Sequence, residues 1–281
     1  MTQIIDRIPE SVFRVISAVV IFILFMLILF PLYFMVTTSF KFESEIYSQF
    51  SWFPREFTGT NYRDVVVNFR IPQYLGNTLI VAISTTSIVV VVSVLASYAL
   101  TRLRFPGRAL MARGVLFVYL IPGSLMLIPM YLIIVKAGLK DTFPGLIIAN
   151  MSFSVPFCTW LMMGYLRTLS HEIEEASLID GCTRMQSLWH IVIPLSIPAI
   201  VTASIFIFNN VWNEYIFALV LAQDDKHKMI SVGLANFQVS DIYRVGPMMA
   251  GSIIAMAPVV TLYILAQRHV VGGLSAGAVK G

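Results

Sequence analysis

Residues 15–40 read VISAVVIFILFMLILFPLYFMVTTSF, a run of 26 residues without Asp, Glu, Lys or Arg. About 20 apolar residues in a helix are enough to cross the hydrocarbon layer of a bilayer. Further uncharged runs of 22 to 31 residues occupy 71–101, 114–135, 142–166, 185–213 and 245–267. The sequence therefore predicts an all-α, polytopic membrane protein with six transmembrane helices. We place the spans at about 15–40, 73–101, 114–135, 145–166, 198–222 and 247–267, in a single domain of residues 1–281.

The composition excludes an ordinary soluble enzyme. Hydrophobic residues make up 58% of the chain and charged residues 12%, about half the charged share of a soluble domain. The 19 basic and 15 acidic residues are spread over short loops, which indicates membrane topology and no nucleic-acid partner. Cys158 and Cys182 belong to no C-x-x-C or Cys/His cluster, so neither a disulfide nor a metal site is predicted. The first run is too long for the core of a signal peptide and should remain as an anchor.

One loop fixes the expected orientation. The segment between the second and third spans carries Arg102, Arg104, Arg108 and Arg113 and no acidic residue, and such loops stay on the cytoplasmic side. With six spans, both termini then lie in the cytoplasm. Over the whole chain the basic residues divide almost evenly between the two sides, so the orientation rests mainly on this loop.

The segment between the fourth and fifth spans, residues 168–197, is too long for a tight turn and predicts two short helices. Ser170 can cap the first helix, and Gly181 suits the left-handed residue that ends it. Thr183 followed by Gln186 is a capping box that opens the second helix. In that helix, apolar side chains fall at i, i+3, i+4 and i+7, namely Met185, Leu188, Trp189 and Val192. The stripe fits a membrane interface, the protein's own spans or a partner subunit.

The amino-acid sequence of this loop resembles a known motif. The matching residues are Glu175-Ala176-Ser177, Asp180-Gly181, Ile191, Ile193 and Pro194. They resemble the EAA loop of binding-protein-dependent ABC importer permeases, in which E-A-A, three residues, Gly, nine residues and I-x-L-P form the coupling helix that docks on the ATPase. Ser177 and Ile193 are mild departures from that pattern. The runs Phe208–Leu219 and Gln267–Gly281 likewise resemble carbohydrate permeases of the maltose type.

The resemblance implies a type I ABC importer permease fold in a bacterial inner membrane. It implies three kinds of partner besides the lipid bilayer: a homologous second permease, two ATPase subunits that hold ATP and Mg, and an external sugar-binding protein. The chain itself would be a transport subunit without a catalytic site, and no cofactor is expected in it. Its function would be to translocate a sugar or oligosaccharide that the binding protein delivers.

The resemblance also assigns roles to residues. The expected contacts with the ATPase are Glu175, Ala176, Asp180, Gly181, Arg184, Met185, Leu188 and Trp189. The cytoplasmic tail, residues 268–281, is glycine-rich, which by itself fits a flexible end. The resemblance implies instead that the tail, with Gly277 and Lys280, reaches between the ATPase subunits.

The fifth span carries the candidate passage residues Asn209, Trp212, Asn213, Glu214 and Tyr215, with Asn210 beside them. Helical spacing places Asn209, Trp212 and Asn213 on one face, and we expect that face to line the passage. An acid inside a span is costly, so Glu214 is expected to have a structural partner in the other permease or an external loop. Alternatively, Trp212 and Tyr215 form an interfacial aromatic belt.

Two other classes of function fit the sequence less well than a permease. The chain has no G-x-x-x-x-G-K-[ST] phosphate loop, so it cannot bind ATP in that way. An ion-coupled secondary transporter is the alternative, but it usually places ionisable groups within its spans, and here Glu214 is the one credible candidate. An intramembrane enzyme would need a catalytic cluster, whereas the four histidines are scattered and no H-E-x-x-H or G-x-S-x-G motif occurs.

Overall fold

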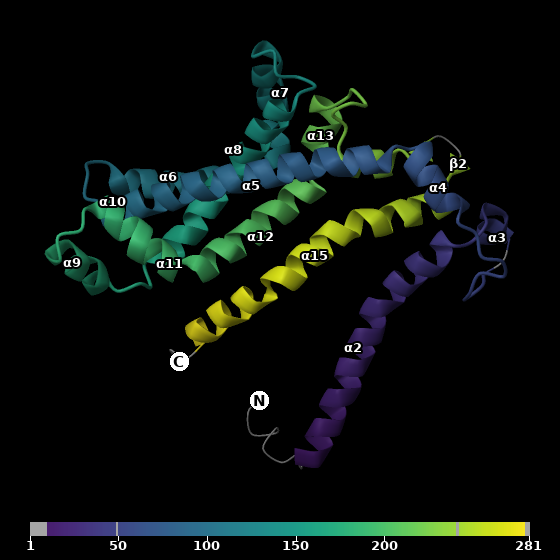
Figure 1. Ribbon diagram of the computed structural model, residues 1–281, viewed down its shortest axis with the longest axis horizontal. Coiled ribbons are helices and arrows are strands. Elements are labelled where there is room, and N and C mark those ends of the chain that lie inside the picture. Colours follow the sequence, from purple (N-terminus) through teal and green to yellow (C-terminus); the bar gives the residue numbers. More distant parts are fainter. Residues whose placement is uncertain (1–9, 49, 240–241, 279–281) are drawn as a thin grey trace. The chain divides into compact units, whose positions relative to one another are not determined.

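The computed structural model describes residues 10–48, 50–239 and 242–278. This part of the chain is helical apart from one two-stranded ladder (Figure 1), which confirms the all-α prediction. Its contacts divide it into two compact units. The first unit contains the residues up to Phe69 and Phe237–Ile254, and the second contains Arg70–Asn236 and the residues from Ala255. The expected single domain of residues 1–281 stays a prediction.

The first unit is built around the long N-terminal helix. Its elements are α2 (Glu10–Ser39), α3 (Glu43–Ser48), α4 (Thr60–Val67), β1 (Gln238–Val239), β2 (Ile242–Tyr243) and the start of α15 (Val245–Ala278). β1 and β2 pair antiparallel. The apolar window of α2 has no residue buried within the chain, so its side chains are open to lipid or to a partner.

The side chain of Asn61 in α4 caps the C-terminal end of α2. The Asn61 Nδ2 group donates hydrogen bonds to the carbonyl oxygens of Ser39, at 2.9 Å, and Lys41, at 2.8 Å. Carbonyl groups at a helix end lack partners within the helix, so this side chain satisfies them. The start of α15 approaches the same side chain, because a Cβ on Gly246 would lie 2.7 Å from it.

The second unit has three long helices at its core, α5 (Ile71–Arg102), α8 (Phe143–Leu166) and α12 (Ile197–Asn213), which pack on one another. Many of their buried side chains are small, among them Ala82, Ser93, Ala149 and Ala203. Small residues let helices in a membrane approach closely. Ser93 Oγ also donates a hydrogen bond of 3.3 Å from α5 to the carbonyl oxygen of Val155 in α8.

Residues 114–135, predicted as one span, contain a sharp break. They belong to α6 (Arg108–Tyr119), the 3-10 turn η1 (Gly123–Met126) and α7 (Leu127–Lys136), and the two halves are bent by 94°. Proline disfavours helical geometry in the residue before it and has no N–H to donate. Pro122 adopts an extended ψ of 128° and so separates the halves.

The fifth predicted span, 198–222, is also discontinuous. α12 ends at Asn213, Glu214 is extended, and α13 (Ile216–Leu221) follows. The Glu214 carboxylate accepts hydrogen bonds from the backbone N–H groups of Phe217, at 2.7 Å, and Ala218, at 2.9 Å. The acid therefore occupies the start of α13, where backbone donors have no partner within the helix.

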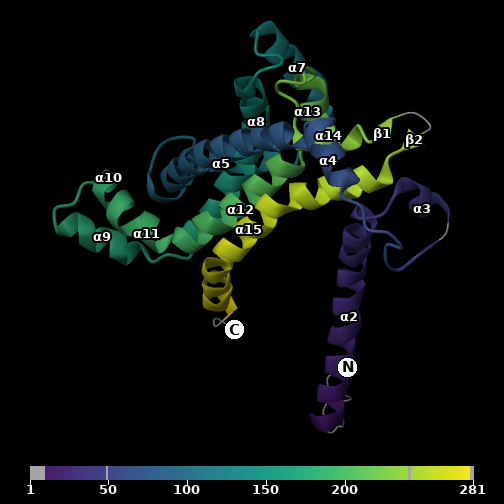
Figure 2. The same cartoon turned by 45° about the vertical axis from the view of Figure 1, so that its right-hand side comes forward.

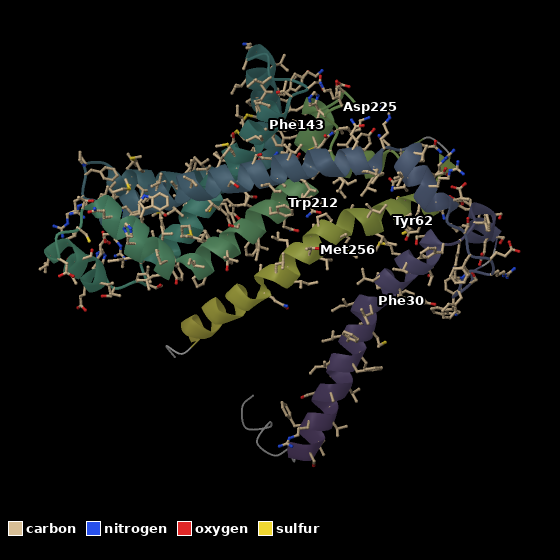
Figure 3. All side chains as sticks on the ribbon, viewed as in Figure 1. Phe30, Tyr62, Phe143, Trp212, Asp225 and Met256 are labelled. Carbon is tan, nitrogen blue, oxygen red and sulfur yellow. The ribbon has the colours of Figure 1, made fainter. Side chains whose placement is uncertain are left out.

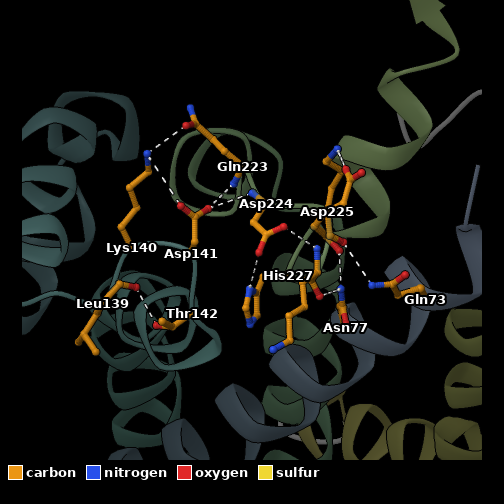
Figure 4. Close-up of polar contacts among 12 residues, drawn as sticks. Gln73, Asn77, Leu139, Lys140, Asp141, Thr142, Gln223, Asp224, Asp225 and His227 are labelled. Atoms are coloured by element: carbon orange, nitrogen blue, oxygen red, sulfur yellow. Dashed lines mark hydrogen bonds and ion pairs between the residues drawn. The ribbon is translucent and has the colours of Figure 1, made fainter.

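The loop between α13 and α14 (Ile230–Ala235) is held by side chains from two directions (Figure 4). Asp141 Oδ1 accepts hydrogen bonds from the N–H groups of Gln223 and Asp224, and Asn77 Nδ2 donates to the carbonyl oxygens of Lys226 and Lys228. α13 and α7 lie side by side (Figure 2). The loop thus fixes the second half of the broken span against α5 and the α7–α8 turn.

Four helices in the described residues are long and apolar enough to cross a membrane. The number rises to six if each of two bent pairs is one span, namely Arg108–Tyr119 with Gly123–Lys136, and Arg184–Leu195 with Ile197–Asn213 at 75°. α5 and α8 cover the predicted spans 73–101 and 145–166. α15 continues past the predicted span 247–267 to Ala278, so the expected flexible tail is helical as far as that residue. Each glycine costs about 1 kcal/mol in a helix, but extending an existing helix adds one hydrogen bond per residue.

Gly145 at the start of α8 permits a close approach that an alanine would block. A Cβ there would lie 2.2 Å from the carbonyl oxygen of Leu139 and 3.2 Å from Ile134 Cγ2. We expect Gly145→Ala to destabilise the protein by about 1–3 kcal/mol and to lower its thermal unfolding midpoint. Gly164→Ala in the same helix is the matched control, because no atom lies within 4 Å of its added Cβ. Equal midpoints would contradict this packing.

Candidate functional site

The loop between α8 and α12 folds into short helices, α9 (His171–Ile179), α10 (Arg184–Ser187), the π-helix η2 (Leu188–Val192) and α11 (Ile193–Leu195). Three local predictions are confirmed. Ser170 Oγ accepts a hydrogen bond from the N–H of Glu172, Thr183 and Gln186 form the capping box, and Gly181 has a φ of +89°. Figures 1 and 2 show these helices grouped at one end of the packed α5, α8 and α12.

The predicted apolar stripe does not form one face. Leu188 is 1% exposed and Val192 is also buried, whereas Met185 and Trp189 are 56% and 54% exposed. The regular α-helical spacing ends at Ser187, because the next residues form a π-helix with i→i+5 hydrogen bonds, which changes the angle between successive side chains. The prediction of a single stripe is therefore wrong, and Leu188 packs inward.

A buried ion pair attaches α9 to the long helices. Arg102 Nε lies 3.3 Å from Glu174 Oε2, and Tyr98 Oη donates a 2.5 Å hydrogen bond to Glu174 Oε1. Arg102 Nη2 also donates to the carbonyl oxygens of Leu166, at 2.9 Å, and Leu169, at 3.0 Å, at the end of α8. One guanidinium thus joins α5, α8 and α9.

Sequence reasoning missed this attachment. It treated Arg102 only as a basic loop residue and Glu174 only as an acid in the first turn of a helix. The spacing of Glu174 and Ser177, at i and i+3, places them on one face of the helix, and this spacing could have indicated a buried polar face. The structure shows that both residues are buried. Ser177 Oγ donates a 2.8 Å hydrogen bond to Ser187 Oγ, so the same face also joins α9 to α10.

The opposite side of the loop is exposed. Of the residues predicted to contact the ATPase, only Leu188 is buried; the exposed ones are Glu175, Ala176, Asp180, Gly181, Arg184, Met185 and Trp189. Ile179 is exposed beside them and was not predicted. An apolar side chain at the exposed end of a short helix is the signal that could have identified it. We call the seven exposed residues and Ile179 the loop surface.

The candidate passage residues separate into exposed and buried groups. Asn213 is exposed and its Nδ2 donates to the backbone oxygen of Asn209, at 2.8 Å, and to its side-chain oxygen, at 3.2 Å. Trp212 is 5% exposed and stacks on Phe208 with ring centroids 5.4 Å apart; Figure 3 labels it on α12. The prediction that Trp212 shares an open lining face with the asparagines is therefore wrong. Tyr215 is exposed.

Glu214 has a different partner from the one predicted. Its carboxylate is bound by the backbone of α13, and its carbonyl oxygen accepts a 2.7 Å hydrogen bond from Ser231 Oγ. These contacts lie within the chain, so the acid needs neither a second permease nor a sugar to satisfy it. It stabilises the break between α12 and α13.

A cavity of about 1140 Å³ lies among α6, α8 and α12. Its walls include the aromatic side chains of Trp160, Tyr165 and Phe206, together with Arg108, Arg113 and Arg167. Thr202 and Phe206 line it from α12, and Asn209 and Asn213 continue their face at i+7 and i+11 from Thr202. The cavity wall and the two asparagines therefore share one side of α12.

The helical fold, the broken spans and the loop surface define a membrane transport subunit, and comparison with known proteins identifies its family. Residues 90–275 match the family described as binding-protein-dependent transport system inner membrane component. The chain belongs to this family. It is a multi-pass inner membrane protein, the permease subunit of an ABC importer that works with a periplasmic binding protein and ATPase subunits, and it is not itself the ATPase.

Individual relatives match almost the whole chain. The inner membrane ABC transporter permease protein YcjP of Escherichia coli is 35% identical over 263 residues, covering 92% of this chain and 94% of the relative. The trehalose/maltose transport system permease protein MalG of Thermococcus litoralis is 31% identical, covering 98% and 99%. A chain of a bacterial ABC transporter involved in the import of the acidic polysaccharide alginate has the same fold, with a TM-score of 0.79 at 22% identity, covering 92% and 96%.

The buried pair gives a test of how the loop is held. Arg102→Met leaves the Glu174 carboxylate buried without its charge partner, which costs about 3–5 kcal/mol. We expect the variant to unfold at a clearly lower temperature and to yield less assembled complex. Arg104→Met is the matched control, because Arg104 is exposed and exposed substitutions change stability by about 0.5 kcal/mol at most. Identical thermal melting curves for the two variants would contradict the anchoring role.

Proposed function

We propose that this permease translocates a sugar or oligosaccharide that an external sugar-binding protein delivers. The observation that carries the proposal is the near full-length similarity to the trehalose/maltose permease. A second observation is chemical: the cavity presents aromatic rings, which stack on pyranose faces, on the same side of α12 as amide groups that can pair with hydroxyls. Sugar-stimulated ATP hydrolysis by the purified complex, across a panel of sugars with the cognate binding protein, tests the proposal directly.

The proposed complex contains this chain, a homologous second permease and two ATPase subunits that bind ATP and Mg. Both termini of this chain are proposed to lie in the cytoplasm, which places the α8–α12 loop on the ATPase side. The proposed tail contact involves Gly277, whose backbone lies within α15, and Lys280, which lies outside the described residues.

The loop surface is proposed as the contact with the ATPase. It combines exposed apolar side chains, Ile179, Met185 and Trp189, with the charged groups of Glu175 and Arg184. Exposed apolar patches rimmed by polar residues mark protein contacts. Behind it, Arg102 and Glu174 connect α9 to α5 and the end of α8. A displacement of the ATPase would therefore be transmitted to the long helices by this ion pair and its hydrogen bonds.

Trp189 provides the test of the proposed ATPase contact. It is half exposed on the loop surface, so Trp189→Ala should leave the fold intact and remove a large apolar contact. Loss of an aromatic hot spot costs about 2 kcal/mol, which is about 30-fold in affinity. We expect a corresponding drop in ATPase binding, measured by titrating ATPase onto immobilised permease pair. Phe117→Ala, an exposed aromatic of α6, serves as the control, and equal affinities would refute the contact.

Gly181 tests the geometry of the same surface. Left-handed backbone costs other L-residues roughly 1–2 kcal/mol, while asparagine tolerates it better. Gly181→Val should therefore uncouple sugar-stimulated ATP hydrolysis far more than Gly181→Asn, although no atom lies near the added Cβ in either. Full coupling in the valine variant would show that the turn is unimportant for the contact.

The proposed passage runs along the cavity side of α12, with Asn209 and Asn213 as sugar-facing groups. Asn213→Ala should raise the sugar concentration for half-maximal uptake while leaving basal ATP hydrolysis and assembly unchanged. Asn210→Ala is the matched control, because Asn210 is also exposed on α12 but lies at the flank of this face. Uptake assays in proteoliposomes compare the two. Normal uptake by Asn213→Ala would remove this asparagine from the passage.

A further inference from the structure

The segment that follows α2 carries an unusual set of exposed aromatic rings. Phe50, Trp52, Phe53 and Phe57 are 57–75% exposed, all within eight residues. Four apolar rings exposed to water in one short loop are unfavourable. An exposed apolar cluster of this kind marks a contact with another phase or molecule. We call residues 50–57 the aromatic segment.

The aromatic segment folds back along the side of α2. Trp52 packs on Phe30 with centroids 6.1 Å apart, and Phe53 packs on Tyr33 at 5.9 Å. Figure 3 labels Phe30 on α2, well before the end of that helix. Phe30 precedes Ser39, the last residue of α2, by nine positions, which corresponds to about 13 Å along the helix axis. The segment therefore returns towards the membrane instead of leading away from it.

The depth of these contacts follows from the charge pattern of α2. The uncharged run begins directly after Arg14 and ends before Lys41. A hydrocarbon layer of about 30 Å is crossed by about 20 helical residues, so a layer that begins after Arg14 ends near Phe34. Phe30 and Tyr33 then lie at the boundary between hydrocarbon and headgroups. Trp and Tyr side chains concentrate at this boundary in membrane proteins.

Polar groups of the aromatic segment have partners within the protein. Tyr33 Oη donates a 2.8 Å hydrogen bond to the carbonyl oxygen of Trp52, and Lys41 Nζ donates one of 2.5 Å to that of Ser51. The Arg55 N–H donates to the Glu45 carboxylate at 3.1 Å. Backbone groups without partners are costly in a lipid environment, and these three bonds reduce that cost.

Glu45 and Lys41 are the charged members of this network. Ser51 Oγ donates a 2.7 Å hydrogen bond to Glu45, which holds the pKa of that carboxyl below its usual range. The Lys41 ammonium lies 5.9 Å from the ring centroid of Phe34, so its charged end reaches back over the aromatic surface. Lys41 is 4% exposed, so its ammonium is held by the backbone of Ser51 and the Phe34 ring rather than by water.

We propose that residues 50–57 form an aromatic anchor that lies in the outer leaflet of the bilayer, with phospholipid covering the rings of Phe50, Trp52 and Phe53. The anchor would fix the height and rotation of α2, whose own side chains make no buried contacts along its apolar window. The partner is lipid because the rings lie at the depth of the boundary between hydrocarbon and headgroups, where aromatic side chains concentrate. The proposal rests on the proposed cytoplasmic N-terminus and not on the identity of the sugar.

Spin labelling of the assembled importer in lipid nanodiscs tests the anchor. In a Cys158→Ala, Cys182→Ala background, a nitroxide is attached to Phe53→Cys, Phe57→Cys or Ser44→Cys. Power saturation then compares relaxation by oxygen, which concentrates in the bilayer, with relaxation by a water-soluble nickel chelate. Ser44 lies on exposed α3 and is the aqueous control. Labelling of Ser44→Cys in whole cells by a membrane-impermeant thiol reagent reports separately on which side of the membrane the segment lies.

The contacts along α2 predict an order of depth. Phe53 packs on Tyr33 of α2, whereas Phe57 packs on Phe40, just past the last helical residue Ser39. Ser39 lies about 9 Å further along the helix axis than Tyr33. We expect the Phe53 label to be oxygen-accessible and nickel-protected, the Phe57 label to be shallower, and the Ser44 label to be nickel-accessible. Nickel access at Phe53 equal to that at Ser44 would place the segment in water and overturn the proposal. Protection of Phe53 from both reagents would place it against another protein and overturn it equally.

Discussion

The ion pair between Arg102 and Glu174 is the contact on which the arrangement of the proposed coupling loop depends. Both side chains are almost completely buried, and burying a charge is costly unless it is paired and hydrogen-bonded. The guanidinium meets this condition with one carboxylate and two carbonyl oxygens, and Tyr98 binds the carboxylate from α5. Because removal of either charge would leave the other unpaired, α9 cannot separate from α5 and α8 without a large energetic cost.

Two of the helix breaks in the second unit show how backbone hydrogen bonds are satisfied where a membrane helix is interrupted. In one, Pro122 has no N–H to satisfy. In the other, the Glu214 carboxylate binds the free N–H groups at the start of α13. Irregular backbone within a membrane is tolerated where protein groups supply its hydrogen bonds. The Glu214 break lies one residue after Asn213, at the end of the α12 face that continues from the cavity wall.

The environment of each helix explains its composition. Between α5, α8 and α12, buried alanines and serines allow close packing, whereas α2 exposes large apolar side chains along its length. Lipid removes the need to bury such side chains within the chain. The same reasoning places the aromatic segment at the bilayer surface, because its rings are exposed while three of its backbone groups are bound by side chains.

Local sequence determined the helical class, the extent of α5 and α8, the caps at Ser170 and Thr183 and the positive φ of Gly181, since each depends on residues close in the chain. Tertiary structure alone decided which side chains face inward. Glu174 and Glu175 are adjacent acids, but only Glu174 meets Arg102, 72 positions earlier. Trp212 is buried whereas Asn213 beside it is exposed, and the π-helix after Ser187 turns Leu188 inward and leaves Trp189 outside. Periodicity assigns a side chain to a face, but contacts between distant segments decide whether protein, lipid or an open cavity covers that face.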